Sequence, residues 1–255
     1  MPTLASRTSR PFIVVLMTEL EDHTWFPAFA RRFQTAFIGY VVTRFNVYAP
    51  FLDHLRALPL SSRPMFDLCS GSGEPAISIF TTSGAFAQLT LSDKFPDASG
   101  AYGPRVRYLP YSVDVLGMRF EHGNVYTMFN ALHHFSDAEK LLIVQRIRSA
   151  GAKAYFVEIL EPGSACLLKV FLATTVGTVL LTPFVLPFSW WRLFFTYIVP
   201  LNVFTIPFDG VISVLRSRSA QRYRQLFLKE GHTVCVTRLT TGIAPLVMVS
   251  IEPSA

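Results

Sequence analysis

The sequence predicts an α/β fold in which a doubly wound, mostly parallel sheet is preceded by helices and interrupted by an apolar helical insert. Three features predict this fold. Short apolar runs alternate with stretches of helical pattern, a glycine-rich turn follows the first run, and polar or acidic residues recur just past the ends of successive runs. Open α/β sheets bind their ligands at that edge, because the carboxyl ends of the parallel strands meet there.

The composition is apolar for a soluble enzyme. Of the 255 residues, 51% are hydrophobic and 16% are charged, and the mean hydropathy is +0.37. Part of the apolar surface is therefore expected to face lipid or a protein partner. The net charge of +6 favours an anionic membrane surface over nucleic acid, since no basic run is interleaved with aromatic residues. Cys69, Cys166 and Cys235 lack metal-ligand spacing and cannot all pair, which indicates a reducing compartment.

Residues 1–60 are expected to form a helical N-terminal cap. Acidic residues follow the apolar run Phe12–Met17 where a signal peptide would have a small-residue cleavage site, so no signal peptide is predicted. From Trp25 to Leu58 aromatic residues recur at helical spacing, and Pro50 is expected to interrupt the helix. The aromatic stripe fits core packing better than a substrate wall. Glu21-Asp22-His23 could supply a carboxylate or an imidazole to a pocket, although a solvated helix start is the favoured interpretation.

The first strand is predicted at Met65–Leu68, and a glycine-rich turn follows it. Gly71 and Gly73 permit positive φ in this turn, and the next helix has Pro75 in its first turn. A strand, a tight turn and a helix N-terminus bring backbone N–H groups close to a nucleotide-like ligand. Asp67 lies at the carboxyl end of the strand. By itself, the pattern is equally compatible with an ordinary βα turn.

Four more strands are predicted, at Gln88–Ser92, Val106–Leu109, Val125–Phe129 and Ala154–Val157. Asp93 follows the first of them, at the ~20-residue separation from the glycine turn expected of a carboxylate that binds ribose hydroxyls. Asp114, Asn130 and Glu158 follow the other three. A capping box predicts the start of a helix over Asp137–Ser149, because Ser136 precedes Glu139 by three residues.

These motifs, in this order, resemble those of class I S-adenosylmethionine (SAM)-dependent methyltransferases. Asp67-Leu-Cys-Ser-Gly71-Ser-Gly73 is similar to their glycine-rich first motif, with Cys69 where an extra glycine usually stands. Ser92-Asp93 resembles the second motif and Ser112-Val113-Asp114 the third. Residues 129–135, Phe-Asn-Ala-Leu-His-His-Phe, resemble the fourth.

The resemblance implies a Rossmann-like, doubly wound, seven-stranded and mostly parallel sheet with an antiparallel last strand. The sixth and seventh strands would be Thr233–Leu239 and Leu246–Ile251. The methyltransferase core would comprise residues 61–162 and 209–255. Ala76 stands where the third glycine of a dinucleotide motif would be, and this disfavours NAD as the ligand.

SAM is the cofactor that the resemblance implies. The backbone from Cys69 to Gly73 would contact its methionine part, Asp93 its ribose hydroxyls and Asp114 its adenine amino group. Phe129 and Asn130 would line the wall near the methyl group. The full set of cofactor-binding residues that the resemblance implies is Asp67, Cys69, Ser70, Gly71, Gly73, Asp93, Lys94, Val113, Asp114, Phe129 and Asn130.

A general base is needed only if the methyl acceptor must be deprotonated. The candidates are His133, His134, Glu158 and Glu161. In the family the position of the two histidines usually packs or forms hydrogen bonds close to the cofactor. Glu158 is expected to face the acceptor space or to orient a loop. Adjacent histidines at a helix start are expected to point in different directions, so no metal site is predicted.

An apolar insert is expected at residues 163–208. Cys166–Phe188 carries one charge, Lys169, and Leu193–Phe208 carries none; Trp190-Trp191-Arg192 between them is typical of an interfacial turn. Prolines shorten both arms, so neither is expected to cross a hydrocarbon core of ~30 Å comfortably. A single crossing is excluded because both ends join one sheet. A hairpin that dips into one leaflet is favoured over paired crossings, and over a soluble cap or a dimer interface.

Basic residues follow the insert, namely Arg216, Arg218, Arg222, Arg224 and Lys229, and are expected on one helix. They suit an anionic cytoplasmic leaflet. We therefore expect a methyltransferase on the cytoplasmic side of a membrane, acting on a small hydrophobic or lipid-like acceptor. The alternatives are an NAD(P)-dependent oxidoreductase with the same fold, and a non-catalytic membrane adaptor with a degenerate cofactor pocket.

Overall fold

The computed structural model describes residues 18–58, 63–97, 100, 102–229, 234–242 and 244–253. The apolar run Phe12–Met17 and the expected start of the sixth strand at Thr233 lie outside the described residues.

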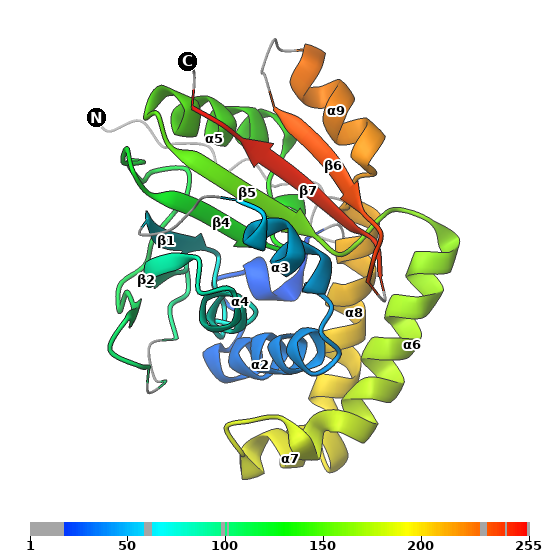
Figure 1. The fold of residues 1–255 in the computed structure, drawn as a ribbon. Coiled ribbons are helices and arrows are strands. Elements are labelled where there is room, and N and C mark those ends of the chain that lie inside the picture. The colour runs from blue at the N-terminus through cyan, green and yellow to red at the C-terminus, as the bar shows by residue number, and fades with distance from the viewer. Residues whose placement is uncertain are drawn as a thin grey trace, which may run out of the picture.

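A seven-stranded sheet forms the centre of the part of the chain that the structure describes (Figure 1). Its strands are β1 (Arg63–Leu68), β2 (Phe86–Ser92), β3 (Val106–Tyr108), β4 (Val125–Phe129), β5 (Lys153–Glu158), β6 (Cys235–Leu239) and β7 (Leu246–Ile251). The strand order is β3-β2-β1-β4-β5-β7-β6, and β7 runs antiparallel to both of its neighbours while the other pairs are parallel. The predicted mostly parallel sheet with an antiparallel last strand is confirmed.

The carboxyl ends of β1, β2 and β4 meet at one edge of the sheet. Asp67 of β1 pairs with Leu91 of β2 on one side and with Thr127 of β4 on the other. After β1 the chain adds β2 and β3 on one side of this strand, and it then adds β4 and β5 on the other side. The strand order therefore reverses at β1. A crevice outside the strand ends at such a point is where open α/β sheets bind ligands.

Helices cover both faces of this sheet (Figure 1). They are α2 (Ala28–Arg44), α3 (Ala49–Arg56), α4 (Ala76–Ser83), α5 (Asp137–Ser149) and α9 (Ala220–Lys229). One apolar cluster joins the sheet to α3 and α4 through Phe51 and Ile79, and a second joins its other face to α5 and α9 through Ile143 and Tyr223. The predicted capping box of α5 is confirmed, with both of its hydrogen bonds present.

The break between α2 and α3 lies before Pro50. α2 ends at Arg44, Asn46 adopts a φ of 50°, and Pro50 lies in the first turn of α3. A proline is tolerated there because its missing N–H would have no partner within the helix. The expected interruption of the helical stretch is confirmed, but it lies just before Pro50, and Pro50 itself belongs to the start of α3.

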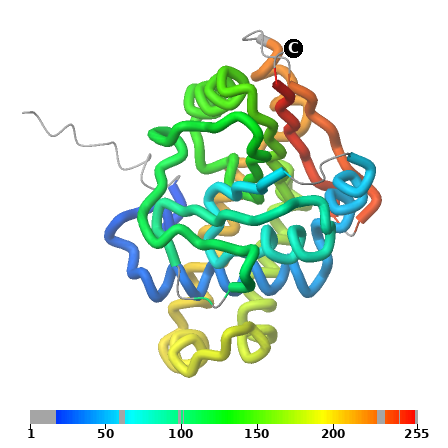
Figure 2. Tube along the Cα trace, turned by 60° about the vertical axis from the view of Figure 1, so that its left-hand side comes forward, coloured from blue at the N-terminus to red at the C-terminus, as the bar shows by residue number. Residues whose placement is uncertain are grey.

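The insert forms two long helices and a short one. α6 (Ser164–Leu181), extended by a 3-10 turn at Thr182–Phe184, and α8 (Leu201–Arg216) lie side by side, and α7 (Trp190–Tyr197) lies at their far end (Figure 1, Figure 2). Gly210 permits the close approach, because a Cβ there would lie 3.0 Å from Val170 Cγ1. α8 continues through Pro207 to Arg216, so the expected boundary at residue 208 falls inside a helix.

Ser164–Phe184 is, among the described residues, a helix long and apolar enough to cross a membrane. It has 21 residues, a mean hydropathy of 1.9, and only 17% of its most apolar window is buried. At 1.5 Å per residue it spans ~31 Å. The expectation that the first arm is too short to cross is therefore wrong by length and composition. α7 and α8 pass the same test as a pair, but they are bent by 82°.

Two basic positions differ from what the sequence pattern indicated. Arg192 is 4% exposed, and its guanidinium donates to the carbonyls of Val185 and Pro187 in the turn between α6 and α7. Buried carbonyls need a hydrogen-bond donor. Arg192 therefore stabilises the turn and is not exposed to bind a lipid headgroup. Arg216 ends α8, whereas Arg222 lies on α9, so the basic residues do not share one helix.

Candidate functional site

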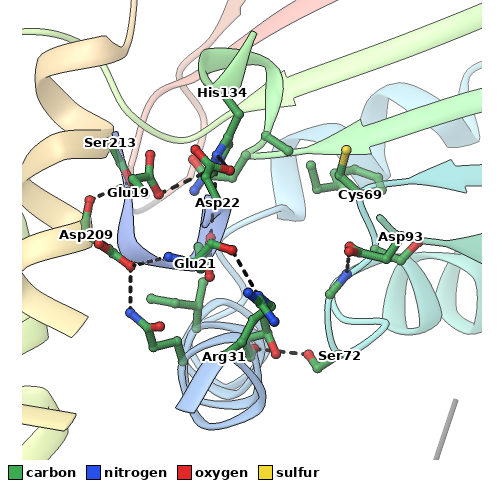
Figure 3. Close-up of a pocket in the computed structure, with 18 of the residues that line it drawn as sticks. Glu19, Glu21, Asp22, Arg31, Cys69, Ser72, Asp93, His134, Asp209 and Ser213 are labelled. Carbon is green, nitrogen blue, oxygen red and sulfur yellow. Dashed lines mark hydrogen bonds and ion pairs between the residues drawn. The ribbon is translucent and has the colours of Figure 1, made fainter. Parts of the chain in front are cut away.

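A cavity of about 740 Å³ opens at the carboxyl edge of the sheet (Figure 3). It is bordered by the turns after β1, β2 and β4, by α2, and by α6 and α8 of the insert. Sites for small molecules have volumes of roughly 300–1,000 Å³. The cavity therefore has room for a small-molecule ligand, and the insert supplies part of its wall.

Most of the residues predicted from the strand ends line this cavity. They are Cys69, Ser70, Gly71, Asp93, Lys94, Val113, Asp114, Phe129, Asn130 and His134. Four other predicted residues, Asp67, Gly73, His133 and Glu158, do not line it. Glu161, a further candidate base, instead forms an ion pair of 2.7 Å with Arg238 outside the cavity.

The glycine-rich turn adopts a backbone that side chains disfavour. Cys69, Gly71 and Gly73 have φ values of 55°, 51° and 92°. The positive φ of Cys69 explains why a glycine suits this position. The N–H of Gly71 donates to Asp93 Oδ2 at 2.9 Å, and the hydroxyl of Tyr108 donates to its carbonyl at 2.8 Å. The turn is thus held from both sides by side chains of neighbouring strand ends.

An acidic segment before α2 forms the opposite wall of the cavity (Figure 3). Glu19, Glu21 and Asp22 line it, and the last two belong to the 3-10 turn η1 (Leu20–Asp22). Glu21 and Asp22 are therefore not a solvated helix start, which corrects the favoured interpretation of the sequence. Burial, with the nearby charge of Glu19, raises the pKa of Glu21 to about 8.

Residues of α2 and α8 that sequence reasoning missed hold this segment in place. Asp209 accepts hydrogen bonds from the N–H of Leu20 at 2.7 Å and from Gln34 Nε2 at 2.8 Å. Arg31 Nε donates to the carbonyl of Glu21 at 2.9 Å. Asp209 is an isolated acid in an apolar stretch, and such a residue needs a partner when it is buried. That isolation was the signal in the sequence.

His133 and His134 lie in the 3-10 turn η2 (Leu132–His134) after β4. His133 Nδ1 lies 2.7 Å from Glu158 Oε2, and Glu158 Oε1 accepts a hydrogen bond of 2.7 Å from the N–H of Leu132. His134 Nδ1 lies 2.9 Å from Asp22 Oδ1. Glu158 is 1% exposed, so the expectation that it faces the acceptor space is wrong, while its alternative role of orienting a loop fits this contact.

The two imidazoles do not point apart. Their ring centroids are 4.5 Å apart, and both rings approach Glu19. Arg216 holds the turn from α8, because its guanidinium donates to the carbonyls of His133 at 3.2 Å and of His134 at 2.5 Å. Burial disfavours a charged imidazole, but the charges of Glu19 and Asp22 outweigh it and raise the pKa of His134 to about 10.

The sequence matches no protein-family model and no curated protein. Solved structures are nevertheless similar in fold. Human N-acetylserotonin methyltransferase in complex with SAM has a TM-score of 0.53 and 14% identity, over 88% of this chain and 56% of that one. An O-methyltransferase family 2 protein of Planctomyces limnophilus in complex with apigenin has a TM-score of 0.52 and 13% identity, over 95% and 67%. PigF with S-adenosylhomocysteine (SAH) has a TM-score of 0.50 and 18% identity, over 92% and 66%.

The chain has the fold of SAM-dependent methyltransferases. It spans 56% to 67% of the length of these three proteins. The expected fold class is thereby confirmed by comparison as well as by strand order.

Two residues of the glycine-rich motif, Asp67 and Gly73, do not line the cavity and instead stabilise the fold next to it. Asp67 is 2% exposed, and its Oδ1 accepts a hydrogen bond of 2.6 Å from Thr127 Oγ1, which joins β1 to β4. A Cβ on Gly73 would lie 2.7 Å from Ile77 Cδ1, so this glycine lets the next helix pack closely. Burial raises the pKa of Asp67 to about 7.

This raised pKa predicts how stability depends on pH. An acid with a pKa of about 7 in the folded state and ~3.9 in the unfolded state makes folding less favourable as the pH rises between those values. Asp67→Asn keeps an acceptor for Thr127 and removes this dependence. The free energy of unfolding of Asp67→Asn relative to the parent protein should rise by up to ~4 kcal/mol across this interval.

Urea unfolding at several pH values between about 4 and about 8 measures this difference. Asp53→Asn is the control, because Asp53 lies on the exposed surface of α3. If Asp67→Asn and the parent protein lose stability in parallel as the pH rises, Asp67 is not protonated in the fold.

Proposed function

We propose that the protein is a SAM-dependent methyltransferase that acts on a small hydrophobic or lipid-like acceptor at the cytoplasmic surface of a membrane. The observation that carries this proposal is the composition of the cavity wall. The glycine-rich turn and Asp93 form one side, and apolar residues of α6 and α8 form another. The same two helices expose apolar side chains outwards.

The residues of the cavity fit SAM. Backbone from Cys69 to Gly71 lines the cavity beside Asp93 and Asp114, whose carboxylates can accept hydrogen bonds from ribose hydroxyls and from an adenine amino group. Asn130 Oδ1 is buried and has no hydrogen-bond partner among the described residues, so a ligand with a donor would satisfy it. When bound, SAM supplies an activated methyl group.

The remaining wall fits an apolar acceptor. Ile38 and Val42 of α2 face the cavity together with Val170, Ala173 and Ile206 of the insert. These side chains exclude water and position the acceptor, which is the main contribution a protein makes to methyl transfer. Of the candidate bases, His134 lines the cavity, whereas His133 and Glu158 are buried behind it. With a pKa of about 10 the imidazole of His134 is protonated at neutral pH, so it can donate a hydrogen bond to an acceptor group but does not take a proton from it.

Exposed apolar side chains support membrane contact. Trp190 and Trp191 begin α7 and are 76% and 67% exposed. Further large apolar side chains are exposed nearby, namely Leu172, Val176, Leu180, Phe184, Leu186, Phe188, Ile198 and Phe204. Large exposed apolar side chains gathered on one group of helices are typical of a membrane or protein contact. An acceptor held in the bilayer could then reach the cavity along α6 and α8.

Binding of SAH tests the cofactor. Asp93→Ala should weaken it by about 1.5–3 kcal/mol, roughly 10- to 150-fold, because a hydrogen bond to a charged group is lost. The loss of its bond to the Gly71 N–H loosens the turn in addition. Isothermal calorimetry gives the affinity, and Asp53→Ala on the surface of α3 is the control.

The same titrations separate the alternatives. Tight binding of NAD without binding of SAH would favour the oxidoreductase. Membrane binding without binding of either ligand would favour the adaptor. Binding of SAH by Asp93→Ala at the affinity of the parent protein would show that Asp93 does not hold the ribose.

Flotation with vesicles of phosphatidylcholine and phosphatidylglycerol tests the membrane contact. Replacing Trp190 and Trp191 by serine should reduce the fraction bound to vesicles at least ten-fold. A large apolar side chain that moves from water into the bilayer contributes on the order of 1.5–3 kcal/mol to membrane binding. Substitution is preferable to deleting the insert, because α6 and α8 also form the cavity wall.

The control replaces Leu142 and Leu228, which are exposed on α5 and α9 at the opposite end of the molecule (Figure 1), by serine. This variant should float like the parent protein. Recovery of the parent protein in the detergent-free soluble fraction as a monodisperse species would refute membrane contact and favour a soluble cap or a dimer interface.

A further inference from the structure

We propose that Glu19, His133 and His134 form a binding site for a divalent transition-metal ion of the zinc class. The site lies where the acidic segment before α2 meets the turn after β4. It goes beyond the proposed methyl transfer and does not depend on it.

The three side chains converge on one point. His133 Nε2 lies 3.3 Å from Glu19 Oε1, and His134 Nε2 lies 3.6 Å from Glu19 Oε2. One ligand atom from each of the three residues can be chosen so that all lie within 4.8 Å of one another. Tetrahedral zinc with bonds of about 2.0–2.1 Å places its ligand atoms about 3.3 Å apart. The cluster therefore needs little movement to enclose an ion.

Both histidines are oriented as metal ligands usually are. A carboxylate receives the Nδ1 side of each ring, Glu158 for His133 at 2.7 Å and Asp22 for His134 at 2.9 Å. Both Nε2 atoms face Glu19, so these are the ring nitrogens available to a metal ion, which would displace any proton that they carry. A carboxylate on the far nitrogen fixes the tautomer and raises the basicity of a ligating imidazole.

Two buried polar atoms face each other at the centre of the cluster. His133 Nε2 and Glu19 Oε1 lie 3.3 Å apart, and neither forms a hydrogen bond with another of the described residues. Their residues are 1% and 2% exposed, so bulk water does not reach either atom. A metal ion between them would satisfy both.

The charge around the cluster suits a cation. Four carboxylates surround the two imidazoles, and two guanidinium groups contact the same segment; these side chains are Glu19, Glu21, Asp22, Glu158, Arg31 and Arg216. Acidic groups therefore outnumber basic side chains around the two histidines.

The donor set selects the class of metal. Two imidazoles and one carboxylate suit zinc, cobalt, nickel or ferrous iron, whereas magnesium and calcium prefer oxygen ligands. Glu21 Oε1, 4.0 Å from His134 Nε2, is placed to become a fourth ligand. Glu19, Glu21 and His134 line the cavity, so an open position on the ion would face the cavity and could bind an oxygen of a ligand there.

Metal binding by the full chain, purified without a histidine tag and stripped with EDTA, tests the proposal. Titration calorimetry should give one Zn²⁺ per chain with a dissociation constant on the order of 1 µM or below. Co²⁺ should give the visible absorption of a four- or five-coordinate site, and Mg²⁺ should not bind at comparable concentrations. Glu19→Gln and His134→Gln should each weaken Zn²⁺ binding at least 100-fold.

His122→Gln is the matched control, because His122 is exposed and lies outside the cluster. It should bind Zn²⁺ like the parent protein. Circular dichroism checks that each variant is folded, and the result for the parent protein stands even if a variant does not fold. A folded parent protein that binds no Zn²⁺ or Co²⁺, or a folded Glu19→Gln with unchanged affinity, would overturn the proposal.

Discussion

Gly71→Val is expected to abolish measurable binding of SAH. Gly71 has a φ of 51°, where a β-branched residue costs on the order of 1–3 kcal/mol. A Cβ there would also lie 3.1 Å from Thr35 Cγ2 and 3.2 Å from Thr35 Cβ, which is tighter than ordinary van der Waals contact, so Thr35 would have to shift by a few tenths of an ångström. The turn cannot shift freely, because Asp93 holds the N–H of Gly71 and Tyr108 holds its carbonyl. The affinity should fall at least 100-fold.

Gly103→Val is the control for this substitution. Gly103 has no positive φ, and a Cβ there would meet no heavy atom within 4 Å. Calorimetry with SAH should find Gly103→Val within a factor of about two of the parent protein. If Gly71→Val also retains that affinity, the turn after β1 does not contact the ligand and the placement of the cofactor is wrong.

Glu158→Ala is expected to lower the free energy of unfolding by about 3–5 kcal/mol. Glu158 is 1% exposed and accepts from the N–H of Leu132, and its other oxygen faces His133 Nδ1. Its removal leaves a buried imidazole and a buried N–H without their partner. Nothing else in the described part of the chain is shown to replace those two contacts. Urea unfolding at neutral pH measures the loss.

Glu161→Ala is the matched control, since Glu161 is only three residues away and its partner Arg238 is half exposed. An accessible ion pair contributes ~0–1 kcal/mol, so this variant should be nearly as stable as the parent protein. Glu158→Gln should be intermediate, because an amide oxygen can still accept from Leu132. Equal stability of Glu158→Ala and Glu161→Ala would show that the buried contact does not stabilise the fold.

Local patterns were enough to place the strands and their order along the chain. The predicted bounds of β4 and β7 agree with the structure, because a short, mostly apolar run of five or six residues between turn signals is typical of a buried strand. The start of α5 was predicted equally well, since a capping box acts within four residues. The break between the helices was expected at Pro50 and lies just before it, because one proline can either end a helix or begin one.

Contacts between distant segments decided the rest of the site. Asp209 bonds to the N–H of Leu20, 189 positions away, and Arg216 bonds to the carbonyl of His133, 83 positions away. Asp209 and Arg216 both lie on α8, but the boundary expected at residue 208 assigned them to the methyltransferase core instead of the insert. Arg192 likewise could not be placed from the sequence. It follows two exposed tryptophans, yet it is buried and donates to the carbonyl of Pro187 in its own turn.

The sequence by itself determined the α/β class, the glycine-rich turn and the polar residues at the strand ends, because each depends on residues adjacent in the chain. Only the tertiary structure decided which of those residues reach the cavity. Asp67, His133 and Glu158 follow the same local pattern as Asp93 and Asn130, yet they turn away from the cavity and are buried. The tertiary structure also brought Glu19 to the two histidines. The physical reason is that burial and electrostatic partners depend on how helices pack over the sheet edge, and no local spacing encodes that packing.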